Sequence, residues 1–187
     1  MNNILSYLIS NYIRPLYCVS KSIHEASTVA KKYHGEFPNY KTYRLLEKLN
    51  KQLELKYTPQ KLYNLTTLNL EYHNLDYLPE NIALLINLRE LNLSFQRLYY
   101  LPESIGQLQN LQYLNLCDNK LYYLPESIGQ LQNLRRLILY DNNLKNLPES
   151  IGLLQNLREI HINNSDSHII NETIKQNDKI YIAKYEY

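Results

Sequence analysis

The apolar residues of this chain recur in two alternating spacings. Residues 111–116 read Leu-x-x-Leu-x-Leu, and the last two leucines have the period of a strand with one buried face. Residues 128–134 then place an apolar residue at every third position, which predicts a short helix or 3₁₀ helix. Pro125 and Glu126 stand between the two patterns, and both types suit a first helical turn. The pattern therefore predicts a strand, a turn and a short return segment.

The same unit recurs at a fixed step along the chain. The stretch Leu-Pro-Glu-Ser-Ile-Gly-Gln-Leu-Gln-Asn-Leu stands at 101–111 and again at 124–134. The number of residues from the start of one copy to the start of the next is the step of the repeat. Close variants at 78–88 and 147–157 extend the series at the same step. A repeat of this length predicts a stacked solenoid, because one unit cannot bury its own leucines. The strands would then form one parallel sheet with neighbours about 4.8 Å apart.

This repeat resembles the leucine-rich repeat family, and the resemblance covers the chain from about Leu65 to its C-terminus. It implies an α/β fold, a leucine-rich repeat solenoid in which a curved parallel sheet is connected by short helical or 3₁₀ return segments. An α-helical N-terminal cap would precede the solenoid, because the first repeat needs apolar cover. We therefore expect a helical region over residues 1–57 and the solenoid over residues 58–187.

The last two repeats are degenerate. In the fifth, Ser167 takes the place of a leucine and Asn171 that of a proline. In the sixth, only Ile180, Ala183 and Tyr185 remain at the apolar positions, which predicts a final strand that closes the stack. The repeats, counted by their first apolar residue, start at Leu65, Leu88, Leu111, Leu134, Leu157 and Ile180.

A polar position follows each predicted strand. In solenoids of this kind it is usually a buried asparagine, whose amide bonds to backbone groups that the turn leaves unpaired. We expect the same role here, including for the histidine, and no ligand or catalytic role for it. The five residues of this column are His73, Gln96, Asn119, Asn142 and Ser165.

The residues before the repeats have helical periodicity. An apolar stripe over 4–13 ends at Pro15, and residues 22–33 and 40–55 are further helical candidates. The third candidate carries a stripe that is well placed to cover the first repeat as a cap, formed by Leu45, Leu46, Leu49 and Leu53.

The apolar residues Ile4, Leu8, Ile13 and Leu16 also resemble the middle and end of an F-box. This resemblance implies docking on the Skp adaptor of cullin-based ubiquitin ligases, with the repeats holding a substrate. The opening Leu-Pro turn of that family is absent, and Ile23 stands where an aromatic residue is usual. A plain cap and an adaptor-binding motif therefore both remain open.

The concave face of the solenoid is the candidate binding site. Side chains between the buried strand leucines point to this face, and several are aromatic or charged types that anchor protein interfaces. The alternative is a solvated sheet surface, and the asparagines at 69, 92 and 115 could form a ladder between equivalent positions. The predicted partner-binding residues are Glu90, Phe95, Tyr113, Asn115, Asp118, Arg136, Ile138, Tyr140, Asp141 and His161.

Tyrosine is abundant, at 19 of 187 residues, and a second tyrosine series lies outside the predicted strands. Adjacent coils would bring Tyr100 over Tyr123, and such aromatic pairs contribute about 0.5 to 1.5 kcal/mol beyond burial. Structural stacking is therefore expected, with a lateral binding patch as the alternative.

Charge and composition argue against several classes of function. A formal net charge of +2 with interspersed basic and acidic residues argues against nucleic-acid binding. The first twenty residues lack the features of a signal peptide or a membrane span, so we expect no membrane partner, no secretion, and a cytoplasmic or nuclear location. Cys18 and Cys117 form no disulfide framework and are expected to be reduced thiols.

No catalytic motif stands out. The chain has no glycine-rich phosphate loop, no paired metal-ligand motif and no nucleophile elbow, so neither a metal nor a cofactor is expected. The sequence predicts a non-catalytic module that binds a protein or peptide on the concave face. Two alternatives remain open, a substrate receptor of a ubiquitin ligase and a structural or vestigial repeat protein.

Overall fold

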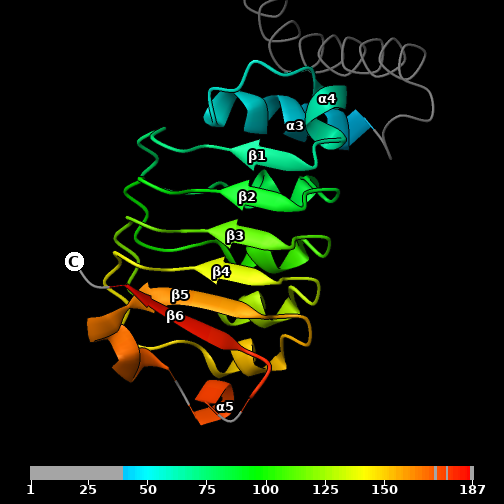
Figure 1. Cartoon of the computed structure of the whole chain (residues 1–187). Helices are drawn as coiled ribbons and strands as arrows, with labels where there is room; N and C mark the ends of the chain where they lie inside the picture. The colour runs from blue at the N-terminus through cyan, green and yellow to red at the C-terminus, as the bar shows by residue number, and fades with distance from the viewer. Residues whose placement is uncertain (1–39, 171, 176, 186–187) are drawn as a thin grey trace, which may run out of the picture. The chain divides into compact units, whose positions relative to one another are not determined.

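The repeats form one parallel sheet whose strands follow the order of the sequence (Figure 1). The computed structural model describes residues 40–170, 172–175 and 177–185, and this part of the chain contains six strands. The sheet and its return segments confirm the predicted solenoid. The strands are β1 (Thr67–Asn69), β2 (Glu90–Asn92), β3 (Tyr113–Asn115), β4 (Arg136–Ile138), β5 (Glu159–Asn163) and β6 (Tyr181–Tyr185).

A short 3₁₀ helix follows each of the first five strands, and the helices after β1 to β4 lie behind the sheet in Figure 1. Four of these helices follow a proline in extended conformation, such as Pro125 with φ −67° and ψ 150°. Proline fixes φ and has no N–H to donate, so it stops the chain from extending the sheet. The helices are η2 (Glu80–Leu84), η3 (Glu103–Gln107), η4 (Glu126–Gln130), η5 (Glu149–Leu153) and η6 (Asn164–Ile169), and α5 (Glu172–Lys175) precedes β6.

The leucines of successive coils lie directly over one another. Leu114 of β3 pairs with Leu91 of β2 and Leu137 of β4, and all three side chains are completely buried. On the return side, Ile105 and Ile128 are also completely buried. Each coil therefore completes the core of its neighbour, as the fixed step of the repeat predicts.

In the described part of the chain, two helices precede the first strand, α3 (Tyr40–Gln52) and α4 (Pro59–Tyr63). Leu46, Leu49 and Leu53 of the predicted cap stripe are buried, in the same compact unit as the repeats. The Thr58 hydroxyl accepts a hydrogen bond from the Lys61 N–H and caps the start of α4. A helical element before the sheet is thus confirmed, whereas the apolar positions Ile4, Leu8, Ile13 and Leu16 lie outside the described residues.

The sixth coil corrects one prediction. A final strand is present, but Glu159 pairs with Tyr181, so the step between the last two strands is shorter by one position than the regular step. A shift of one position turns every side chain of a strand to the opposite face. Tyr185 therefore lies on the same face as His161 and not at the expected inward position. Ala183 is buried as expected, but it pairs with His161 and not with Ile160.

Buried side-chain amides connect neighbouring coils. Asn119 donates to the Leu93 carbonyl at 2.8 Å and accepts from the Leu98 N–H at 3.1 Å, and both partners belong to the preceding coil. Asn142 repeats these bonds one coil later, and Gln96 replaces the asparagine one coil earlier. The predicted role of this column is confirmed at these three positions.

The two ends of the column depart from this pattern. His73 is exposed, and its Nδ1 lies 3.1 Å from the Glu71 carbonyl oxygen of its own coil. Ser165 is exposed and bonds to the Asp166 side chain. Neither residue forms the bridge between coils that the central amides form.

Neighbouring return segments come very close together. A Cβ at Gly129 would lie 2.5 Å from the Ser150 carbonyl oxygen and 2.6 Å from the Ser150 Cβ. Gly106 has the same relation to Ser127 one coil earlier, with the carbonyl oxygen at 2.5 Å. The glycine of these return segments is therefore required by the packing between coils.

We predict that Asn119→Ala lowers the free energy of unfolding by about 2 to 4 kcal/mol, because it leaves a buried carbonyl and a buried N–H without partners. Urea denaturation monitored by circular dichroism measures the change. Asn133→Ala is the matched control, since this exposed amide donates one bond, to the Gln109 carbonyl, that water can replace. Its expected cost is under about 1 kcal/mol, and equal costs for the two variants would contradict the account.

We predict that Gly129→Ala costs about 1 to 3 kcal/mol of unfolding free energy, because the added methyl group forces backbone of the next coil to move. Thermal denaturation measures the effect. Gln130→Ala, on the exposed side of the same segment, should stay within about 0.5 kcal/mol. A Gly129→Ala variant as stable as the parent would show that the coils are not packed this tightly.

Candidate binding face

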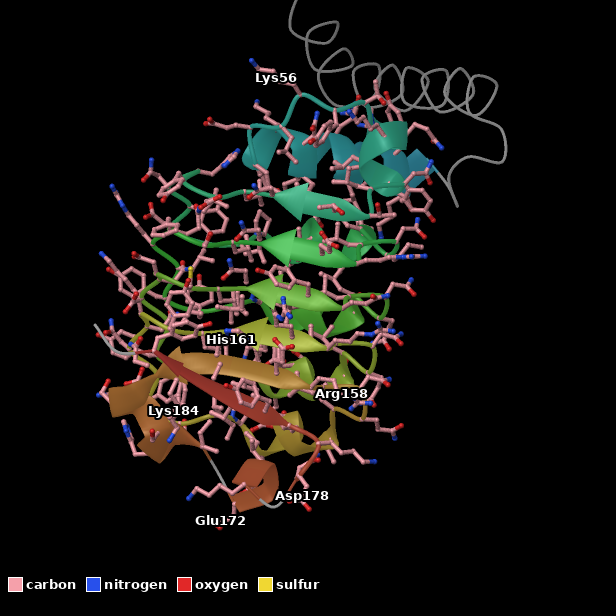
Figure 2. All side chains as sticks on the ribbon, in the orientation of Figure 1. Lys56, Arg158, His161, Glu172, Asp178 and Lys184 are labelled. Carbon is pink, nitrogen blue, oxygen red and sulfur yellow. The ribbon has the colours of Figure 1, made fainter. Side chains whose placement is uncertain are left out.

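The side chains between the strand leucines form an open face, which we define by the outward residues of β1–β6 and the second and third residues after each of β1–β4. Figure 2 shows Arg158 at the start of β5 and His161 farther along it. The face is supported by backbone bonds between strands, such as Leu93 N–H to the Asn115 carbonyl at 2.8 Å. Its side chains therefore project from a backbone that is already ordered.

Charged side chains gather where β4 and β5 meet. Arg136 bonds Glu159 through two guanidinium nitrogens, and the second of these, Nη2, lies 3.1 Å from the carboxylate. His161 Nε2 lies 3.1 Å from the same carboxylate. The hydrogen bond from Arg136, followed by that from His161, lowers the pKa of Glu159, and the bond to Glu159 raises the pKa of Arg136.

Aromatic rings adjoin this charged group. The ring of Tyr185 lies 5.1 Å from that of Tyr140 and 5.6 Å from that of His161, and its hydroxyl is 2.8 Å from His161 Nδ1. We call Arg136, Tyr140, Glu159, His161 and Tyr185 the terminal cluster. The predicted partner-binding residues include neither Tyr185 nor Glu159, although strand alternation already places Glu159 on this face. Only the shortened last step, not visible in the repeat pattern, brings Tyr185 to this face.

Three other predicted residues lie in the middle of the face. Tyr113 is half-buried, and burial raises its pKa although Arg136 acts in the opposite direction. Ile138 is buried, with 9% of its surface exposed. Glu90 is exposed on β2, next to Tyr113 in the sheet register.

The asparagines of the face do not bond to one another. Asn115 Oδ1 accepts the Cys117 N–H at 3.0 Å, and Asn69 and Asn92 accept the N–H of the residue two positions on in the same way. The expected ladder between equivalent positions is therefore wrong. Each amide is used within its own strand end, where it fixes the start of the turn.

The third residue after each of β1 to β4 has a left-handed backbone conformation. Asp118 has φ 50° and Asp141 has φ 55°, values that aspartate tolerates. Phe95 and Tyr72 have φ 56° and 59°, which is costly for bulky side chains, and their rings stack with centroids 4.5 Å apart. This aromatic pair lies at the first two coils, while the terminal cluster lies at the last three.

A hollow of about 320 Å³ opens at the entry side of the strands. Besides the predicted Glu90, Tyr113 and Arg136, it is lined by Gln112, Arg135, Arg158 and Glu159. Sequence reasoning missed Arg135 and Arg158 because they precede the alternating strand positions. The recurrence of arginine at 89, 135 and 158 was the available signal.

The expected stack of Tyr100 on Tyr123 is absent. Neither ring has an aromatic contact with any residue that the structure describes, in contrast to the stacked pair of Tyr72 and Phe95. Tyr100 and Tyr123 are 59% and 61% exposed, so each ring faces solvent and does not cover its neighbour. The stacking interpretation of this series is wrong.

Two structural features bear on catalysis, namely groups of metal-ligating side chains and the environment of Cys117. Within the ranges that the structure covers, no three histidine, cysteine, aspartate or glutamate side chains are grouped to hold a metal ion. Cys117 is 2% exposed, and burial raises the pKa of its thiol, which disfavours the nucleophilic thiolate. In the same ranges, no helix has the length and apolar character needed to cross a bilayer.

Comparison with known proteins shows similarity to leucine-rich repeat proteins. Residues 103–176 match the family described as a leucine-rich repeat region. No curated protein sequence matches the chain. A leucine-rich repeat protein of Leptospira interrogans is 33% identical over 66% of this chain and 38% of its own chain, with a TM-score of 0.53.

Two plant structures have a similar fold. The peptide hormone receptor RGFR1, solved in complex with RGF2, is 26% identical over 67% of this chain and 21% of its own, with a TM-score of 0.57. The leucine-rich repeat ectodomain of the receptor kinase SOBIR1 from Arabidopsis thaliana is 22% identical over 63% of this chain and 67% of its own, with a TM-score of 0.50. The chain therefore spans well under half of the bacterial protein and of the hormone receptor.

The terminal cluster predicts an abnormal titration of Glu159. Carbon-13 NMR of its carboxyl group should give a pKa below the ordinary range, and Arg136→Met should raise this pKa because the main hydrogen-bond donor is lost. Since folding lowers this pKa, the ion pair stabilises the fold above the unfolded value and loses that effect as the pH falls. Arg97→Met should leave the titration unchanged, and no response to Arg136→Met would refute the network.

Proposed function

Because residues 103–176 match the leucine-rich repeat family and β1–β6 form the parallel sheet of such a solenoid, we propose that the chain is a non-catalytic interaction module that binds a protein or peptide on the open face of its sheet. The observation that carries this proposal is the terminal cluster, in which aromatic and ion-paired side chains from three adjacent strands lie together. Tyrosine and arginine are enriched among the residues that dominate binding energies.

The ordered backbone supports the proposal. Each strand is bonded to its neighbours and the central turns are fixed by side-chain amides, so a partner meets a surface that loses little freedom on binding. Tyr72 and Phe95 keep bulky rings at left-handed positions, where the cost is of order 1 to 3 kcal/mol each. Such strain is concentrated at functional sites, which adds support for a role of this face.

The size of the face sets the class of partner. Six strands about 4.8 Å apart span about 24 Å, and a standard interface buries about 800 Å² on each side. A peptide or one small domain fits such a surface. The similar plant receptor was solved in complex with RGF2, which supports the binding of a ligand by a repeat array of this kind.

The ligase-receptor hypothesis stays a prediction. Its adaptor-binding residues Ile4, Leu8, Ile13 and Leu16 lie outside the described residues, and the described fold serves an isolated interaction module and a substrate receptor equally. A vestigial role predicts instead that no substitution on the open face changes any binding constant.

The proposal predicts that Tyr140→Ala weakens partner binding by about tenfold or more, since truncating an interface hot spot costs about 2 kcal/mol or more. Proteins captured by the full chain would be identified by mass spectrometry and their affinities measured by isothermal titration calorimetry. Tyr123→Ala is the matched control, because this tyrosine is exposed outside the open face.

Thermal denaturation of both variants separates lost binding from lost folding. A partner that binds the Tyr140→Ala variant as tightly as the parent, but binds the Tyr123→Ala variant weakly, would move the binding site to the lateral tyrosines. That result would contradict the proposed function of the open face.

A further inference from the structure

We propose that the bound segment carries an acidic side chain, and that its carboxylate docks between Arg135 and Arg158 in the hollow at the entry side of β4 and β5. This inference rests on the proposed function and specifies the chemistry of the partner. It is carried by the placement and pairing of the charges that line the hollow.

The two arginines are not used by the fold as ion-pair partners. Arg158 donates only to backbone carbonyls, those of Leu157 at 3.2 Å and Gln155 at 3.4 Å, within the described part of the chain. The Arg135 side chain has no hydrogen bond or ion pair with any residue that the structure describes, and it is exposed. Both guanidinium groups therefore keep donors for an external carboxylate, which arginine binds with two parallel bonds.

The other charges of the hollow leave a small positive excess. Arg136 and Glu159 neutralise each other through their paired hydrogen bonds. The negative charge of Glu90 balances the charge of one of the two remaining arginines. The three arginines and two glutamates that line the hollow therefore have a net charge of +1. This excess matches one carboxylate, whereas a phosphate dianion would meet stronger repulsion from the two glutamates.

The opposite margin of the face has the opposite sign. Asp118 and Asp141 follow β3 and β4, and neither has an ion-pair partner among the described residues. Positions 135 and 141 are about 20 Å apart along an extended chain, which exceeds the Debye length of about 8 Å at physiological salt. The two margins act separately, and an acidic group is favoured only at the entry side.

An aromatic surface lies between the two margins. Tyr140 and Tyr185 lie on the open face, farther along the strands than the hollow. Tyr140 lies five positions after Arg135, so an extended segment whose carboxylate lies at Arg135 would place a residue about five positions away against these rings. The partner segment should therefore combine an acidic residue with an apolar residue at that spacing.

The test uses random dodecapeptides displayed on phage and selected on the immobilised full chain. Enriched sequences should carry an aspartate or glutamate near an apolar residue. Fluorescence anisotropy of the synthesised peptides should show that replacing the acid with its amide weakens binding about tenfold or more. The affinity should also fall as sodium chloride is raised.

Variants of the protein locate the contact. Arg135→Gln and Arg158→Gln should each lower the affinity for the acidic peptide about tenfold. They should also reduce the difference in affinity between the acidic peptide and its amide. Arg97→Gln is the matched control, because this exposed arginine follows β2 outside the hollow and should change neither affinity. Circular dichroism should show unchanged melting for all three variants.

The possible outcomes separate the two proposals. Peptides that lack acidic residues and depend on Tyr140 but not on Arg135 would overturn the inference and leave the open face as the binding site. Displacement of the peptides by inorganic phosphate, beyond the effect of chloride at equal ionic strength, would overturn the assignment to a carboxylate. Peptides that are insensitive to every substitution on the open face, or an absence of enrichment, would overturn both proposals.

Discussion

Burial of leucine between adjacent coils is the interaction on which the rest of this structure depends. A single coil is a thin loop that cannot enclose its own apolar residues, so its free energy becomes favourable only when a neighbour covers it. Leu91, Leu114 and Leu137 are completely buried because each lies directly over the next. The same requirement explains the buried leucines of α3, which lie before the first strand.

Stacking the coils buries polar backbone groups that need hydrogen-bond partners, and the side-chain amides supply these partners. The turn after each strand leaves backbone donors and acceptors that cannot join the sheet, and Asn119 and Asn142 satisfy them across the coil boundary. The backbone is therefore fixed without help from the outward side chains. These side chains are free to differ from coil to coil, which lets the open face carry aromatic and charged groups while the core repeats.

Much of the fold could be predicted from the sequence, because the buried positions recur. The fixed step of the repeat predicted the strands, the 3₁₀ return segments and the role of Asn119. The position of Tyr185 could not be predicted in this way, since one missing position in a degenerate coil reverses its face and leaves no mark in the pattern. Likewise, Asn92 bonds within its own coil, and periodicity cannot distinguish this from a bond between coils.

The candidate site was predictable in part. Arg136, Tyr140 and His161 were recognised by type and by strand position, and the structure brings them together through Glu159 and Tyr185. Arg135 and Arg158 precede the alternating positions, so a rule based on strand period passes over them. Phe95 has no sequence signal for a left-handed backbone, because that conformation is usual for glycine, asparagine and aspartate.

The central claim is that the open face of the sheet contacts the partner, and site-specific photo-crosslinking tests it most directly. A benzophenone amino acid would replace Tyr113 in one variant and Tyr123 in another, and both would be irradiated with captured partners. The account predicts a covalent adduct from position 113 and none from position 123. An adduct from position 123 alone would contradict it and assign binding to the lateral tyrosines.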